Sequence, residues 1–240
     1  MLVEVCANSL ESAMNAQKAG ADRIELCAEL AVGGITPSYG LLKCIKTHLK
    51  IPVHVLVRPR SGDFTYSSGE FNIMKRDIEL CIELGFDGIV SGVLHKDFTL
   101  DVERTKALVD LSGNLKFTFH RAFDWVLNPL ATLKKLETLG VDYILSSGQQ
   151  NSALQGIELL RALHKKATSC SIMPGGGINS DNAREFKSSG FGAVHLSGSE
   201  YIKRLEESPA VSMNSPSFLS NQGVFVSSVN AIERVIKEVK

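Results

Sequence analysis

The sequence predicts an α/β protein in which all 240 residues form one domain, a closed (β/α)8 barrel of the TIM type. Three observations support this prediction. Short apolar runs with strand character alternate with helical patterns along the whole chain. Four segments repeat one motif, in which a helical end is followed by a glycine and a short apolar strand. No glycine-rich turn follows the first apolar run, which disfavours an open dinucleotide-binding sheet.

Eight strands are expected. In chain order they lie in LVEVCA, KAGADRIELC, PVHVLVR, ELGFDGIVSG, LKFTFHR, TLGVDYILSSG, CSIMPG and SSGFGAVHLSG. In four of these segments the apolar run follows Gly20, Gly85, Gly140 or Gly190. A glycine at that point is favoured because it can take the left-handed conformation that ends many helices.

Helical patterns fill the intervals between the strands. We expect helices at residues 9–19, 39–48, 70–84, 101–112, 129–139, 153–167, 180–189 and 227–239. Capping residues support two of them: Asn128 precedes Pro129 at a first helical position, and Ser67 or Ser68 stands ahead of Glu70. Residues 200–226, which are rich in serine, asparagine and proline, are expected to form a long loop before the last helix.

The composition excludes several classes of partner. The 26 basic and 26 acidic side chains leave no basic excess, so neither nucleic acid nor an anionic membrane surface is an expected partner. No apolar run approaches the ~20 residues that span a bilayer, and the N-terminal stretch lacks a basic region, so we expect a cytoplasmic protein. The five cysteines are widely spaced without a C-x-x-C pair, which favours reduced thiols over disulfides or a local zinc motif.

Alternation along the strands assigns side chains either to the surrounding helices or to the barrel interior. The expected interior set is Glu4, Cys6, Asn8, Glu25, Cys27, His54, Leu56, Arg58, Thr118, His120, Met173, His195 and Ser197. Barrels of this type are usually filled by Val, Ile and Leu, and buried charges persist only when they are paired or bound. The polar interior therefore predicts a functional site. The alternative is a purely structural network in which Glu4 and Glu25 pair with Arg58 or Lys116.

The rim at the C-terminal ends of the strands has features of an anion site. Loops after the seventh and eighth strands commonly hold phosphate in this fold. The expected donors are Gly175, Gly176, Gly177, Ser197, Gly198 and Ser199. The expected charged partners are Arg58, Arg60 and Arg121. The alternative is that the glycine triplet only makes a tight turn.

The motif HRAFD places His120 at the end of the fifth strand, followed by Arg121 and Asp124. A histidine there is a candidate for proton exchange near pH 7, with Asp124 orienting its ring and Glu4 or Glu25 as a second acid or base. Alternatively, Asp124 only caps a turn toward Asn128. Together with the rim residues, this motif favours an enzyme that acts on a small anionic metabolite, either phosphorylated or sugar-like.

Cys6 and Cys27 are expected at equivalent places on neighbouring strands, which lie roughly 4.8 Å apart. Soft thiolates select Cu(I), and His54, His120, His195 and Met173 are candidates for further ligands. The alternative is that both cysteines are packed as small hydrophobic residues.

Six motifs, in order from residue 2 to about residue 180, resemble the CutC family of copper homeostasis proteins. They are EVCANSLESAMNAQKAGADRIELC, GGITPS, VRPRSGDFTYS, FTFHRAFD, SSGQQNSALQG and MPGGGI. The resemblance implies a cytoplasmic TIM-like barrel, a homo-oligomer (dimer or tetramer), and Cu(I) binding through two cysteines that correspond to Cys6 and Cys27. The rim motifs of the family correspond to Arg58, Arg60 and Asp63 and to His120, Arg121 and Asp124, which implies a pocket without a defined reaction. The segment 195–223 departs from the family pattern.

Overall fold

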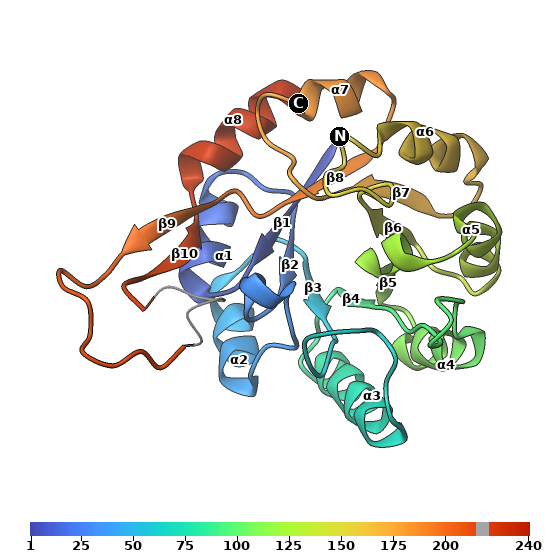
Figure 1. Cartoon of the computed structure of the whole chain (residues 1–240), viewed down its shortest axis with the longest axis horizontal. Coiled ribbons are helices and arrows are strands. Elements are labelled where there is room, and N and C mark those ends of the chain that lie inside the picture. The colour runs from blue at the N-terminus through green and yellow to red at the C-terminus, as the bar shows by residue number, and fades with distance from the viewer. Residues whose placement is uncertain (215–220) are drawn as a thin grey trace.

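Eight parallel strands form a ring that is surrounded by helices (Figure 1). The computed structural model describes residues 1–214 and 221–240. The strand order is β7-β6-β5-β4-β3-β2-β1-β8, and β7 and β8 meet at an isolated bridge between Gly175 and His195. The barrel is therefore nearly closed, and the predicted (β/α)8 fold is confirmed.

Each barrel strand lies within a predicted run. The strands are β1 (Leu2–Ala7), β2 (Arg23–Leu26), β3 (Val53–Leu56), β4 (Gly88–Ser91), β5 (Lys116–Phe119), β6 (Tyr143–Ser146), β7 (Ser171–Pro174) and β8 (Ala193–Leu196). Two short 3-10 helices, η1 (Leu30–Val32) and η2 (Arg121–Trp125), lie in loops that follow β2 and β5. These loops contribute to the rim on the C-terminal side of the barrel.

The outer helices also follow the predicted order. They are α1 (Leu10–Lys18), α2 (Tyr39–His48), α3 (Ser68–Glu83), α4 (Val102–Ser112), α5 (Pro129–Thr138), α6 (Ile157–Lys166), α7 (Ala183–Ser188) and α8 (Val229–Val239). Asn128 caps α5, and Ser67 forms a capping box with Glu70 at the start of α3. Helices α6 and α7 begin later than expected because turns precede them.

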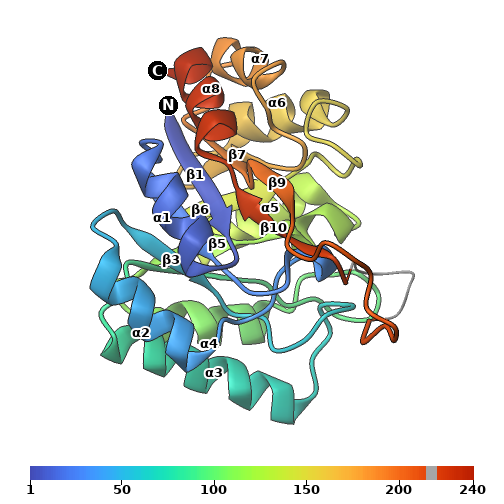
Figure 2. The same ribbon diagram turned by 90° about the vertical axis from the view of Figure 1, so that its left-hand side faces the viewer.

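The prediction of one long loop over residues 200–226 is wrong at both ends of this segment, where the chain forms strands. The strands β9 (Ser199–Lys203) and β10 (Gly223–Ser227) pair antiparallel and form a hairpin that projects beyond the ring (Figures 1 and 2). The base of this hairpin is held on α1, because the Ser227 backbone donates to Oγ of Ser12 and accepts from Nδ2 of Asn15. Residues 215–220 lie outside the described residues.

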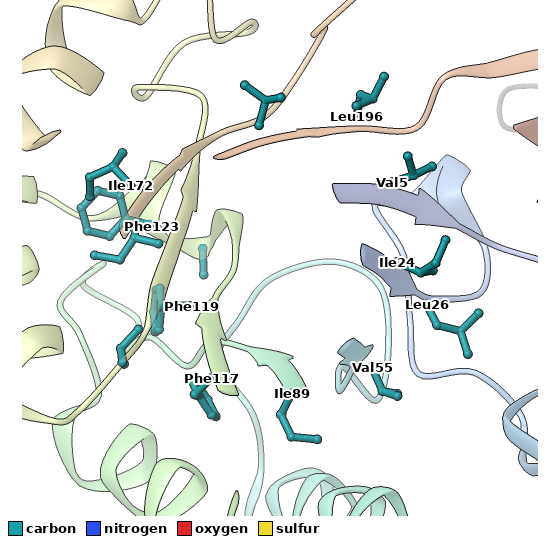
Figure 3. Close-up of a cluster of buried hydrophobic side chains, with 14 of the residues drawn as sticks. Val5, Ile24, Leu26, Val55, Ile89, Phe117, Phe119, Phe123, Ile172 and Leu196 are labelled. Atoms are coloured by element: carbon teal, nitrogen blue, oxygen red, sulfur yellow. The ribbon is translucent and has the colours of Figure 1, made fainter. Parts of the chain in front are cut away.

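The strands separate two layers of side chains. Apolar residues such as Val5, Ile24 and Phe117 point outward from the ring toward the helices, as Figure 3 shows. Cys6, Cys27, Leu56 and Val90 form a separate buried cluster on the inner side. The inward and outward side chains of the strands are thus separated as expected. Asn8, expected inside, lies beyond β1, where it accepts from Oγ of Ser12 on α1 and donates to the carbonyl oxygen of Phe225. Within the described chain, no helix has the length and apolar character needed to cross a membrane.

Candidate functional site

A cavity of about 820 Å³ opens at the C-terminal ends of the barrel strands. Nine of the predicted site residues line it: Cys6, Glu25, Arg58, His120, Arg121, Asp124, Gly176, Gly177 and Ser197. His195, one of the candidate metal ligands, is also in the lining. The structure places Glu4, Cys27, Arg60, Gly175 and Gly198 outside this lining.

Cys6 and Cys27 lie side by side, with their Sγ atoms 3.5 Å apart. They do not occupy equivalent places on the two strands, because Cys6 pairs in register with Glu25 and Cys27 lies beyond the end of β2. Cys6 reaches the cavity, whereas Cys27 is fully buried under the following loop, where Gly34 approaches it closely. The contact with Cys27, together with burial, raises the pKa of the Cys6 thiol well above its usual value.

Arg58 holds the loop that covers the thiols. Its Nη1 donates to the carbonyl oxygens of Val32 at 2.9 Å and Gly34 at 2.8 Å. Its Nη2 donates to the carbonyl oxygen of Gly62 at 2.7 Å. These bonds engage both terminal nitrogens, so Arg58 joins the loops after β2 and β3. Its charge forms no ion pair with a carboxylate of the described residues, its Nε has no partner among them, and the residue lines the cavity, so its expected contact with an anion stays a prediction.

Arg60 also differs from expectation. It lies outside the cavity lining, where Nε donates to Oε1 of Glu70 at 2.5 Å and Nη2 donates to the carbonyl oxygen of Thr65 at 2.8 Å. A further bond joins Nη2 to the Asp63 carboxylate at 3.3 Å. Arg60 and Asp63 thus stabilise the loop that leads into α3 and do not face the site.

Glu4 is the centre of a buried ionic network. Its Oε2 accepts from Nε of Arg23 at 2.5 Å, and its Oε1 lies 2.8 Å from Nδ1 of His195. Burial opposes ionisation, but the bond to His195 and the charge of Arg23 outweigh it and lower the pKa of Glu4 to about 2. As the alternative to a functional site, we expected an ionic network of Glu4 with Arg58 or Lys116. These partners are wrong, because Glu4 pairs with Arg23 and His195. Arg23 was not in the expected set, although it shares the inward alternation of Glu25.

Glu25 stands between this network and the cavity. Its Oε1 lies 3.6 Å from Sγ of Cys6, and its Oε2 lies 3.9 Å from Nδ1 of His195. Oε2 is buried and forms no hydrogen bond with the described residues. Burial raises the pKa of Glu25. Burial also opposes the charge on His195, but the two glutamates outweigh it and raise the pKa of the imidazole.

A possible metal-ligand group lies at the inner end of the cavity. Sγ of Cys6, a carboxylate oxygen of Glu25 and a ring nitrogen of His195 lie within 4.8 Å of one another. Sulfur and imidazole donors of this kind suit soft and borderline metals. Two other expected ligands are not brought to this group. Met173 contacts Nη2 of Arg23 at 3.7 Å, and the buried His54 ring packs edge-on against Tyr143 outside the cavity lining.

His120 lies in the cavity wall, but its surroundings change its expected role. Burial, with Arg58 nearby, lowers the pKa of the ring to about 3, so the imidazole is neutral near pH 7. Nδ1 accepts from the backbone N–H of Ala122 at 3.2 Å, which leaves the proton on Nε2. The ring packs on Phe64 with 4.8 Å between centroids. His120 is therefore arranged as a hydrogen-bond donor and not as a proton carrier at neutral pH.

Asp124 does not orient His120. Its carboxylate accepts from Oγ of Ser146 at 2.6 Å and from the backbone N–H groups of Ser147 and Gln149. It also binds Nε of Arg121 at 2.8 Å. Asp124 thus fixes the loop after β6 and holds Arg121. Ser147, which binds both Asp124 and Arg121, was not predicted, since its role depends on the folding of this loop.

The glycines after β7 and β8 differ from one another. Gly176 and Gly177 line the cavity with φ values of 106° and 76°, where a side chain would be strained. Gly175 instead packs closely against Leu145 and His195. Gly198 packs against Ile232 of α8, where an added Cβ would lie 2.8 Å from Cγ1. Of the predicted anion donors, Gly176, Gly177 and Ser197 thus line the cavity, and Gly175, Gly198 and Ser199 do not.

Comparisons with known proteins identify the family of this chain. A family model described as the CutC family matches residues 1–200. Two curated relatives described as family protein CutC, from Salmonella agona and Salmonella typhi, are each 42% identical over 226 residues. The matches cover 94% of this chain and 87% and 83% of the respective relatives.

Solved structures with a similar fold include a member of the same family. A crystal structure of a CutC protein from Streptococcus agalactiae is 34% identical, with a TM-score of 0.78. It covers 82% of this chain and 98% of its own chain. Thiamine phosphate pyrophosphorylase from Pyrococcus furiosus matches 99% of this chain and 95% of its own, with a TM-score of 0.59. At 16% identity, this second likeness shows a shared barrel fold alone.

Proposed function

The chain belongs to the CutC family, and on this premise we propose that it acts in copper homeostasis by binding Cu(I) between Cys6 and Cys27. The observation that carries the proposal is the 3.5 Å separation of the two Sγ atoms at the inner end of a cavity. Two thiolates are preferred ligands for a soft monovalent ion. Cys6 is the point of entry, because it lines the cavity while Cys27 is fully buried.

The separation of the sulfurs also favours a third ligand. Two metal–thiolate bonds of about 2.3 Å would hold sulfurs roughly 4.6 Å apart in a straight line. The observed 3.5 Å is shorter, so an ion bound to both would lie off the line that joins them. His195 and Glu25 stand next to Cys6 and are the side chains that would complete the coordination. The carboxylate of Glu25, when ionised, also offsets part of the positive charge of Arg23.

The chemistry of the site indicates where the protein works. All five cysteines are free, and a Cu(I) site of two thiols requires a compartment that keeps thiols reduced. We therefore propose a cytoplasmic location. Assembly as a dimer or tetramer stays a prediction of the family resemblance.

A competition titration with a chromophoric Cu(I) chelator under anaerobic, reducing conditions tests the copper site. We expect the unchanged protein to take up about one Cu(I) per chain, and Cys6→Ser/Cys27→Ser to lose this uptake. Cys44→Ser is the matched control, because Cys44 is an exposed thiol on α2 that should contribute no specific site. If His195 is a ligand or orients one, His195→Gln should weaken binding by about 10- to 100-fold.

The outcome is decisive in either direction when folding is checked by circular dichroism. Equal uptake by the unchanged protein and by Cys6→Ser/Cys27→Ser would remove the proposed site. Loss of uptake in Cys44→Ser to the same degree would show non-specific thiol binding. Loss that is confined to the inner pair supports the proposal.

A further inference from the structure

The cavity has a second polar surface, formed by the loops after β5 and β7, that the copper site does not use. The carbonyl oxygen of Gly176 accepts from the N–H of Ala153 at 2.8 Å, and that of Gly177 accepts from Nδ2 of Asn182 at 2.8 Å. The N–H groups of Gly176, Gly177 and Ile178 find no acceptor among residues 1–214 and 221–240. All three residues line the cavity, so their N–H groups are available to an anion.

Arg121 brings its guanidinium to the same place, with its charge paired to Asp124. Nε donates to Asp124 at 2.8 Å and Nη2 donates to Oγ of Ser147 at 2.7 Å, which fixes the plane of the guanidinium. Nη1 has no acceptor in the described part of the chain. It lies 3.6 Å from the position that a Cβ on Gly176 would occupy. A side chain at residue 176 would therefore fill the space between the free Nη1 and the loop, which glycine leaves open.

His120 adds an independent sign of a missing ligand. The residue is 5% exposed and lines the cavity, and its Nε2 is buried without a hydrogen-bond partner among the described atoms. Since Nδ1 is occupied as an acceptor, Nε2 is an unsatisfied donor, and burying a donor without a partner is unfavourable. A ligand that accepts from this nitrogen would remove that cost.

From this arrangement we infer that the cavity binds a small phosphate monoester, with its phosphate at Arg121, Gly176 and Gly177 and its hydroxylated carbon body extending toward His120. A guanidinium edge and several backbone N–H groups together suit the three oxygens of a monoester phosphate. The cavity of about 820 Å³ is far larger than a phosphate ion and includes the rings of Phe64 and Trp125. It therefore has room for an organic body beside the anion.

Direct binding to the metal-free protein tests this inference separately from the copper proposal. The probes are glycerol 3-phosphate, inorganic phosphate, and glycerate as a carboxylate analogue. Isothermal titration calorimetry in a phosphate-free buffer with a metal chelator gives the three affinities. We expect glycerol 3-phosphate to bind more tightly than inorganic phosphate, because only the monoester reaches His120, and we expect glycerate to bind most weakly.

Two variants test the two ends of the bound ligand, and a third variant is the control. Arg121→Gln should weaken both phosphate probes by about tenfold or more, as expected for the loss of a charge-assisted hydrogen bond. His120→Phe keeps the ring against Phe64 but removes Nε2, so it should weaken the monoester and leave inorganic phosphate unchanged. Arg204→Gln is the matched control, since this exposed arginine pairs with Glu11 outside the cavity and should change neither affinity.

Several results would overturn the inference. They are no binding of glycerol 3-phosphate at millimolar concentration, tighter binding of glycerate, and an unchanged phosphate affinity in Arg121→Gln. An unchanged monoester affinity in His120→Phe would overturn the placement of the carbon body. Arg121→Lys serves if Arg121→Gln does not fold. It keeps the charge but cannot bind Asp124 and Ser147 in the same plane, so phosphate affinity should again fall.

Discussion

At the scale of single residues, the barrel interior shows how charge is kept inside a protein. Glu4 is completely buried, yet it remains ionised because Arg23 and His195 contact its two oxygens. A buried ion pair of this kind gains little over an apolar pair, but removing one partner leaves an uncompensated charge. The network therefore constrains which substitutions the interior tolerates, and it fixes His195 beside Cys6 and Glu25.

His54 provides a pH-dependent test of this interior. The ring is buried, its Nδ1 has no partner in the described chain, and burial lowers its pKa to about 4. As the pH falls below about 6.5, the unfolded chain takes up a proton before the folded protein does. The stability contributed by neutral His54 is thus fully present above pH 6.5 and is lost toward pH 4, at up to about 1.4 kcal/mol per pH unit.

Two measurements check this expectation. An NMR titration of the imidazole C–H signals should give His54 a pKa near 4, and a value near 6.5 would contradict the neutral, buried state. Urea unfolding at several pH values should show a shallower loss of stability in His54→Gln between pH 6.5 and 4. The slope is the relevant quantity, because Gly88 packs closely on the ring and any substitution will also change the packing.

The residue-scale predictions from sequence were correct where alternation decides the outcome. Alternation places Cys6, Cys27 and Glu25 on the inner side, and the structure has them there. Alternation cannot tell which inward groups will meet, because partners depend on register and on loop conformation. For this reason the bonds from Arg58 to loop carbonyl oxygens were not foreseen. Arg23, which shares the inward alternation of Glu25, could have been included but was not.

At the scale of elements, the rim loops are built around close backbone contacts. The loop after β6 returns so closely that a Cβ on Gly156 would lie 2.0 Å from the carbonyl oxygen of Ser147. Ser147 in turn binds Arg121 and Asp124. The position of the guanidinium in the cavity thus depends on a glycine contact that lies away from the cavity itself.

Gly156→Ala tests this dependence. Because backbone atoms cannot move aside as a flexible side chain can, we expect the substitution to displace the loop and to cost several-fold in phosphate affinity as well as about 1–3 kcal/mol in stability. Gly85→Ala is the control. Gly85 has φ +71° but no atom within 4 Å of an added Cβ, so the variant should lose only about 1–2 kcal/mol and keep its phosphate affinity. Equal binding by both variants would show that the contact does not position Arg121.

Helices and strands that are marked by nearby capping residues or glycines were predicted correctly. The β9–β10 hairpin lacks such markers and was missed. Strand runs, glycine ends and caps identify the barrel, because each unit is defined within a few residues. The hairpin of β9 and β10 has no such signal. Its strands pair residues 20 to 28 positions apart, such as Lys203 with Gly223 and Ser199 with Ser227, and the intervening composition is that of a loop.

At the scale of the whole molecule, the site spans the place where the barrel closes. β7 and β8 meet at the bridge between Gly175 and His195, whereas β4 and β5 pair over four consecutive positions. Of the proposed copper ligands, Cys6, Glu25 and His195 belong to β1, β2 and β8, and Cys27 follows β2. The proposed phosphate donors follow β5 and β7. The proposed copper site and the proposed phosphate site thus lie on opposite sides of the junction between β7 and β8, which we call the seam of the barrel.

This seam should be the least stable part of the barrel. Fewer ladder hydrogen bonds mean a smaller free energy of local opening, and each 1.4 kcal/mol corresponds to about a tenfold change in exchange rate. In hydrogen–deuterium exchange followed by mass spectrometry, we expect peptides over 171–175 and 193–198 to exchange about tenfold faster than those over 23–26 and 88–91, which pair with both neighbouring strands over three or four positions. A ligand that contacts the loop after β7 should slow exchange on that side, whereas Cu(I) should slow it mainly on the β8 side. Uniform protection around the ring would show that the single bridge closes the barrel as firmly as a full ladder does.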